Sequence, residues 1–240
     1  MKIAMGDHEY QDTTGGAIGI IDQYLKPLNL TKTYYSFDMN NVHVTVIDPF
    51  IDYVSTSDQY RFIEQDLRNA STNPKIDWIF VVESKPIYTS PSKHKAQSTI
   101  RDTYHPLFDK YGVDLVLTSD NHNYQRTFPL KYNNNADSSN PIIVDRNQTN
   151  YKGNNTGQIY LIIGTAGRSL YDIEEQAPFV ANQSHDHFGF LNIEINANNI
   201  SSLTGTFYSN ENDNEDDDTL GSNNLIKNNN ILDKFTISKN

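Results

Sequence analysis

Apolar segments alternate with amphipathic ones between Val42 and Leu117, and this alternation constrains the fold more than any other feature. The apolar segments are rich in β-branched residues, which is typical of strands buried on both faces of a sheet. The expected strands are 42–48, 76–82 and 113–118, and the expected helices are 59–70 and 97–111. Because a strand–helix–strand order builds βαβ units, we predict an α/β fold with a parallel or mixed sheet, whose functional loops lie together at the carboxyl ends of the strands.

A different pattern begins after Pro129, where short strands alternate with turns. The expected strands are 158–163, 189–195, 203–208 and 231–237. Their spacing indicates an antiparallel meander that packs as a second sheet on the first. An acidic, low-complexity loop at 210–230 interrupts the meander. This loop lacks the glycine and the final Glu of an EF-hand calcium loop, so we expect it to be solvated rather than to bind calcium.

Charge and composition exclude several classes of function. The formal net charge of −11 argues against nucleic acid as a partner, because nucleic acids are held by clustered Lys and Arg. The chain has no Cys, so any metal must be bound by His, Asp, Glu or Asn. No apolar run approaches the roughly 20 residues that span a bilayer, so we expect no membrane partner. The compartment stays open, since a lack of Cys fits either side of a membrane and an omitted leader would allow secretion.

Polar residues gather in three loops that follow apolar segments. The loops contain Gly6-Asp7-His8-Glu9, Glu83-Ser84-Lys85 and Ser119-Asp120-Asn121-His122, and Tyr124 and Arg126 follow the last of them. Carboxylate, imidazole and guanidinium groups at the carboxyl ends of strands are typical of metal and phosphate sites. The sequence therefore predicts that these three loops meet in one site.

These loops resemble motifs of the calcineurin-like metallophosphoesterases, in particular the branch that contains the purple acid phosphatases. Residues 6–9 are similar to the family's Gly-Asn-His-Glu box, and 81–90 resemble its strand that ends in a metal-binding His before a Pro. Residues 119–127 resemble the Gly-His-x-His box with its Tyr and Arg neighbours. The resemblance covers nearly all of the chain. It implies a four-layer αββα sandwich holding two metal ions that bind a phosphate ester and activate a water molecule.

The resemblance also implies which residues bind metal. Asp7 stands where the family has a metal-binding Asn, Ser84 and Asp120 replace two metal-binding His residues, and His122 matches the remaining His. Serine is a poor ligand for Zn²⁺, Fe or Mn²⁺, whereas a carboxylate can still bind a hard cation. We therefore expect Asp7, Asp120 and His122 to hold a divalent ion (Mn, Mg, Zn or Fe), one ion rather than two. Asp120 could instead cap the following turn, and His122 could be an ordinary loop histidine.

Three further residues are implied to take part in catalysis. His8 matches the His that steadies the transition state or the leaving group, and His94 resembles a second substrate-facing His of the purple acid phosphatase branch. Arg126 is expected either to hold substrate phosphate or to form a structural ion pair. A His without its partners is often structural, so a structural role stays open for both histidines.

The family's Asp-x-His and Gly-Asp boxes precede the Gly-Asn-His-Glu box, but only Met1 to Met5, expected to form a short strand, come before it here. We therefore expect an N-terminally incomplete αββα sandwich, in which 1–240 forms the C-terminal part of one metallophosphoesterase-like domain; two small lobes are the alternative. Missing strands would leave a sheet edge unpaired. A second polypeptide that supplies them, a misplaced start codon or a gene remnant would each explain the pattern.

Two functional hypotheses follow from this sequence. The first is a metal-dependent phosphoester hydrolase-like protein with an altered metal site, whose partner is a phosphate ester. The second is a catalytically silent pseudo-phosphoesterase that acts as a binding or structural module, or a gene fragment. The substrate is not readable, because specificity would come from loops such as Lys131 to Asn155, which match no recognition pattern.

Overall fold

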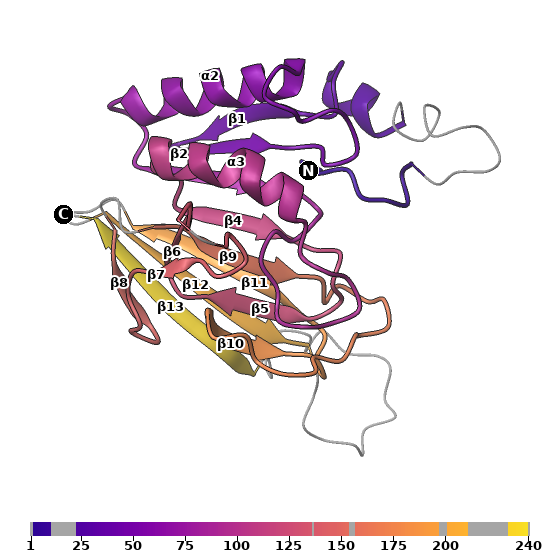
Figure 1. Cartoon of the computed structure of the whole chain (residues 1–240), viewed down its shortest axis with the longest axis vertical. Helices are drawn as coiled ribbons and strands as arrows, with labels where there is room; N and C mark the ends of the chain where they lie inside the picture. The colour runs from indigo at the N-terminus through magenta and orange to yellow at the C-terminus, as the bar shows by residue number, and fades with distance from the viewer. Residues whose placement is uncertain are drawn as a thin grey trace, which may run out of the picture.

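The structure is a computed structural model of the chain, and it describes residues 2–10, 23–135, 137–153, 157–196, 201–210 and 230–239 (Figure 1). The acidic loop expected at 210–230 lies outside the described residues except for its two end positions. No helix in the described ranges is long and apolar enough to cross a membrane.

The larger sheet of the described chain has seven strands in the order β1-β2-β3-β4-β9-β5-β10. Their bounds are β1 Tyr35–Met39, β2 Val42–Val46, β3 Trp78–Val82, β4 Leu115–Thr118, β9 Ile159–Ile163, β5 Tyr124–Thr127 and β10 Val180–Ser184. Strands β2, β3, β4 and β9 are parallel, whereas β1, β5 and β10 pair antiparallel with their neighbours. The expected mixed sheet is confirmed, and its central parallel strands direct their carboxyl ends to one edge.

Two helices cover one face of this sheet, α2 (Asp58–Thr72) and α3 (Ser98–Tyr111) (Figure 1). The Ser57 side chain accepts a hydrogen bond from the Tyr60 amide at 3.1 Å, which caps α2. Ile63 and Leu67 of α2 are fully buried in the core between helices and sheet. The helical spacing in the sequence thus marks the buried face correctly. A short 3₁₀ helix, η1 (Lys26–Leu28), precedes β1.

A second sheet packs on the other face of the larger one, with the order β11-β12-β13-β8 (Figure 1). Its strands are β11 Gly189–Asn196, β12 Ser201–Ser209, β13 Ile231–Lys239 and β8 Asn150–Lys152. The antiparallel meander of β11, β12 and β13 is as expected. The placement of 158–163 in this sheet was wrong, because β9 lies in the larger sheet, between β4 and β5. There it pairs parallel with β4, and all but its last residue are buried.

The described residues supply three layers, helices, larger sheet and smaller sheet, of the expected αββα sandwich (Figure 1). The cores on the two faces of the larger sheet are separate, one under α2 and α3 and one between the sheets. The expected strand at Met1 to Met5 is not formed, because residues 2–6 pair with no strand. Instead, the Tyr35 hydroxyl binds the backbone N–H and carbonyl of Ile3.

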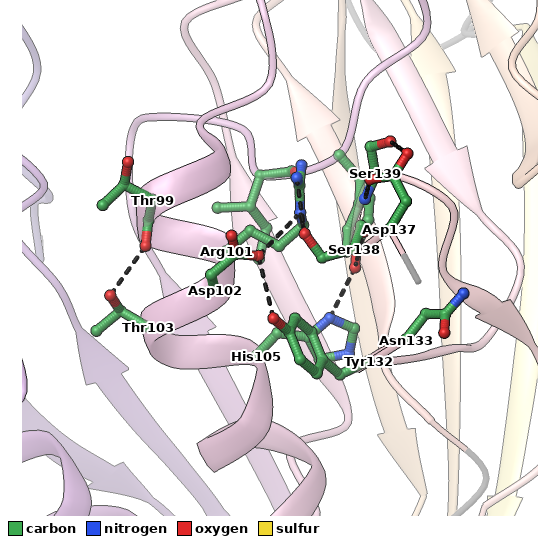
Figure 2. Close-up of polar contacts among 12 residues, drawn as sticks. Thr99, Arg101, Asp102, Thr103, His105, Tyr132, Asn133, Asp137, Ser138 and Ser139 are labelled. Atoms are coloured by element: carbon green, nitrogen blue, oxygen red, sulfur yellow. Dashed lines mark hydrogen bonds and ion pairs between the residues drawn. The ribbon is translucent and has the colours of Figure 1, made fainter. Parts of the chain in front are cut away.

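A small hairpin of β6 (Leu130–Lys131) and β7 (Ile142–Ile143) begins the long loop at 131–155. Figure 2 shows how this loop is held against α3: the Arg101 guanidinium donates to Ser138 Oγ (3.1 and 3.0 Å), and the Tyr132 hydroxyl donates to Asp102 (3.2 Å). These contacts attach Tyr132 and Ser138 to the helical layer.

Candidate functional site

The three predicted loops converge on one cavity of ≈ 300 Å³ beyond the carboxyl ends of β3, β4 and β9. The predicted residues on its wall are Gly6, Asp7, His8, Ser84, His94, Ser119, Asp120 and His122. The turn after β9 completes the wall, with Gly164, Ala166, Arg168 and Tyr171. No described residue of the loop at 131–155 lines this cavity, so the structure does not associate that loop with ligand selection there.

Backbone pairing between neighbouring strands positions the second and third loops. The Glu83 amide donates to the Leu117 carbonyl (3.1 Å), and the Ser119 amide donates to the Ser84 carbonyl (3.1 Å). These bonds extend the β3–β4 ladder beyond the last strand residues. They bring Ser84 and Asp120 to the same wall, as the parallel order of the strands predicts.

Asn121 is a positioning residue that the sequence interpretation did not single out. Its side chain is fully buried, and its amide nitrogen donates to the His94 carbonyl (2.8 Å) and to Thr89 Oγ1 (3.0 Å). The His94 amide in turn donates to Asn121 Oδ1 (2.8 Å). This clamp fixes the loop that carries His94 against the loop that carries Asp120.

Asp120 forms an ion pair with a neighbouring lysine. Lys85 Nζ lies 2.9 Å from Asp120 Oδ1, and the two side chains are 18% and 6% exposed. Asp120 Oδ2 is buried with no hydrogen-bond partner among the described residues, and His94 Nδ1 lies 3.9 Å from it. Asp120 also has a positive φ of 55°, a conformation that Asp tolerates better than most residues. The carboxylate is thus neutralised by a side chain from the adjacent loop.

The orientation of His122 is set by the turn after β9. Its Nδ1 lies 2.8 Å from the Ser169 carbonyl, and its ring stacks on Tyr171 with centroids 4.0 Å apart. A carbonyl can only accept, so Nδ1 is the protonated nitrogen. In a neutral ring the lone pair is then on Nε2, the form in which imidazole binds a metal or accepts a proton.

The described side chains do not assemble a metal centre. No group of three or more His, Asp and Glu residues in the described chain is arranged to hold a metal ion. Asp7, Asp120 and His122 share the cavity but not a common ligand geometry, and Ser84 Oγ is buried without a hydrogen-bond partner in the described structure. With Lys85 on Asp120, this donor set does not fit a divalent cation.

Arg126 does not lie in the cavity, so its predicted catalytic position is corrected. The side chain is buried between the sheets, where Nε and Nη2 donate to the two carboxylate oxygens of Asp233 at 2.6 and 3.0 Å. Nη1 donates to the Tyr151 hydroxyl at 2.6 Å. Burial of a guanidinium requires such pairing, so the alternative of a structural ion pair is the one observed. His8 and His94 do line the cavity, and their catalytic roles stay predictions.

Glu83, which precedes Ser84, does not line the cavity either. Its carboxyl group is buried, and neither oxygen has a hydrogen-bond partner among the residues that the structure describes. Burial raises the pKa of Glu83 to about 8, because the charged form loses its hydration. Glu83 is therefore not available as a carboxylate ligand beside Asp120.

Known proteins resemble this chain over different lengths, although no protein-family model matches it. An uncharacterised Mycobacterium tuberculosis protein is 29% identical over 187 residues, covering 69% of this chain and 35% of that protein. In Arabidopsis thaliana, purple acid phosphatase 21 is 31% identical over 122 residues (50% and 28%). Probable inactive purple acid phosphatase 24 of the same plant is 27% identical over 219 residues (84% and 34%). The chain spans about a third of the length of these relatives.

The solved structure of purple acid phosphatase PPD1 from yellow lupin seeds has the same fold. It matches with a TM-score of 0.72 and 22% identity, over 99% of this chain and 40% of the lupin chain. The predicted α/β class and metallophosphoesterase-type fold are therefore confirmed. The comparisons together show that the chain is related to the purple acid phosphatases in sequence and shares their metallophosphoesterase-type fold.

Proposed function

We propose that this chain is a phosphoesterase-like domain that binds a phosphate ester in the cavity and does not itself carry out metal-dependent hydrolysis. The observation that carries this proposal is the Lys85–Asp120 ion pair at 2.9 Å. It occupies a carboxylate that the family resemblance assigns to a metal. Several related plant proteins bear names that call them probably inactive, which agrees with such a role.

A phosphate ester is the ligand class that the relationship and the cavity both favour. Several names among the relatives are those of phosphatases. His8, His94 and Arg168 line the cavity, and imidazole N–H and guanidinium groups donate hydrogen bonds to phosphate oxygens. We further propose that 1–240 acts as one domain, because both cores share the larger sheet.

The competing proposal is a phosphoester hydrolase that holds one hard cation. Asp7, Asp120 and His122 line the same cavity, and a histidine whose Nδ1 donates to a carbonyl is oriented as metal-binding histidines are. The relationship to purple acid phosphatases supports a divalent metal cofactor in general.

Turnover and binding measurements separate the two proposals. Hydrolysis of an aryl phosphate is measured with a chelator and with Mn²⁺, Mg²⁺, Zn²⁺ or Fe²⁺, and binding of inorganic phosphate is measured by calorimetry in the chelator. We expect binding without turnover. Metal-dependent turnover that disappears in a folded Asp120→Ala, His122→Ala variant would establish the hydrolase instead.

A further inference from the structure

The Lys85 ammonium is held in place by more than one contact. It donates to Asp120 Oδ1 at 2.9 Å and lies 5.4 Å from the centroid of the Phe50 ring. With its side chain 18% exposed, Lys85 is partly desolvated, and its partner is nearly buried. A charge pair shielded from water is stronger than an exposed surface pair. Lys85 does not itself line the cavity, but the ion pair holds its ammonium group beside Asp120, which does.

A metal ion and this ammonium compete for the same carboxylate. A hard cation must approach a carboxylate oxygen to about 2.0–2.6 Å, which would place it within a few ångströms of Lys85 Nζ. Two positive charges at that separation repel strongly where water is partly excluded. Ser84 adds no imidazole or carboxylate that would offset the repulsion. Lys85 and a divalent cation thus exclude each other at Asp120.

The same pair changes how the cavity receives an anion. Asp7 and Asp120 both line the wall, and two carboxylates without a counter-charge would repel a phosphate group. Lys85 cancels the charge of Asp120, so Asp120 does not oppose the attraction of an anion by the Arg168 guanidinium, which also lines the cavity. The cavity can then take an oxyanion with no metal present.

We infer that Lys85 takes the place of a metal ion at Asp120, and that the cavity binds a phosphate-type oxyanion in the metal-free protein. This inference rests on the proposed phosphate ester function and names the side chain that makes it metal-independent. It predicts opposite responses to one substitution. Loss of the Lys85 charge should weaken the binding of the oxyanion and strengthen the binding of a divalent cation.

The test compares the whole chain with Lys85→Met, Lys85→Arg and Lys95→Met. Lys95 is an exposed lysine that does not line the cavity. Lys95→Met changes the net charge by the same amount as Lys85→Met, so it is the matched control. Mn²⁺ binding and, separately, inorganic phosphate binding in a chelator are measured by calorimetry, and thermal melting verifies folding. For Lys85→Met we expect Mn²⁺ affinity to rise roughly 10- to 100-fold and phosphate affinity to fall at least about tenfold. For Lys95→Met we expect changes below about twofold.

The outcomes distinguish this inference from the proposed function. If the wild-type chain binds no phosphate in the chelator, the proposed function fails and the inference fails with it. If it binds phosphate but folded Lys85→Met changes neither affinity, only the inference is overturned. Lys85→Arg keeps the charge and should keep phosphate binding without gaining Mn²⁺. The inference would also be overturned if the wild-type chain binds Mn²⁺ stoichiometrically and with an affinity no lower than that of Lys85→Met.

Discussion

The ion pair between Arg126 and Asp233 offers a decisive test of how the two sheets are joined. Arg126 is in β5 of the larger sheet and Asp233 in β13 of the smaller one, and their side chains are 1% and 3% exposed. Two tyrosines form hydrogen bonds with the pair: the Tyr124 hydroxyl donates to Asp233 at 2.7 Å, and Arg126 donates to the Tyr151 hydroxyl at 2.6 Å. The perturbation is Arg126→Met or Asp233→Leu, each alone and both together.

The magnitude follows from leaving one charge without its partner. Removing one side of a buried, hydrogen-bonded pair typically costs about 3–5 kcal/mol, because the remaining charge keeps its desolvation penalty. Replacing both sides removes that penalty and leaves the tyrosine hydroxyls short of a partner, at about 1 kcal/mol each. The double variant Arg126→Met, Asp233→Leu should therefore cost no more free energy of unfolding than either single variant.

Urea denaturation at neutral pH measures these free energies, with an unchanged m-value as the control for two-state unfolding. Phosphate binding is measured without urea, at a temperature where each variant is folded. It should stay within about twofold of wild type, because neither Arg126 nor Asp233 lines the cavity. The reasoning is refuted by an Arg126→Met variant that keeps wild-type stability and loses phosphate binding. Strictly additive losses in the double variant would refute the estimate of the buried-charge penalty.

Three further predictions concern titration and close packing. Burial raises the pKa of Glu83 from 4.5 to about 8. The free energy of unfolding of the wild type should therefore fall by roughly 1.4 kcal/mol per pH unit as the pH rises between those two values. Glu83→Gln should remove that slope in urea titrations, and parallel curves would contradict it. Burial alone would lower the pKa of His43, but the hydrogen bond and charge of Asp66 outweigh it and raise the pKa above 6.5. The stabilisation that protonated His43 contributes to the fold should thus be complete below pH 6.5 and be lost as the pH rises through the raised pKa. A His43→Asn variant whose free energy of unfolding depends on pH as that of the wild type does would disprove this. A Cβ at Gly164 would lie 2.0 Å from the Asn121 carbonyl oxygen, so Gly164→Ala should lose about 1–3 kcal/mol; an unchanged melting temperature would count against that contact.

Sequence alone determined the main helices and strands between residues 42 and 118 and the place of the candidate site. Local periodicity predicted a helix at 59–70 and a strand at 76–82, and the structure has them at Asp58–Thr72 and Trp78–Val82. Burial of one helix face or both strand faces imposes these patterns locally, so they can be read without the fold. Parallel pairing of β3 and β4 then brought the loops after them to one edge, which is why Ser84 and Asp120 share a cavity.

Only the tertiary structure decided which side chains pair across those elements. β9 lies between β4 and β5 rather than in the second sheet, although its apolar run would suit either place. Arg126 finds its partner 107 residues away in Asp233. Lys85 reaches Asp120 because two neighbouring loops bring them to 2.9 Å, whereas the sequence separates them by 35 positions. Such pairings depend on distances between side chains in the folded molecule, and no local pattern in a single sequence encodes them.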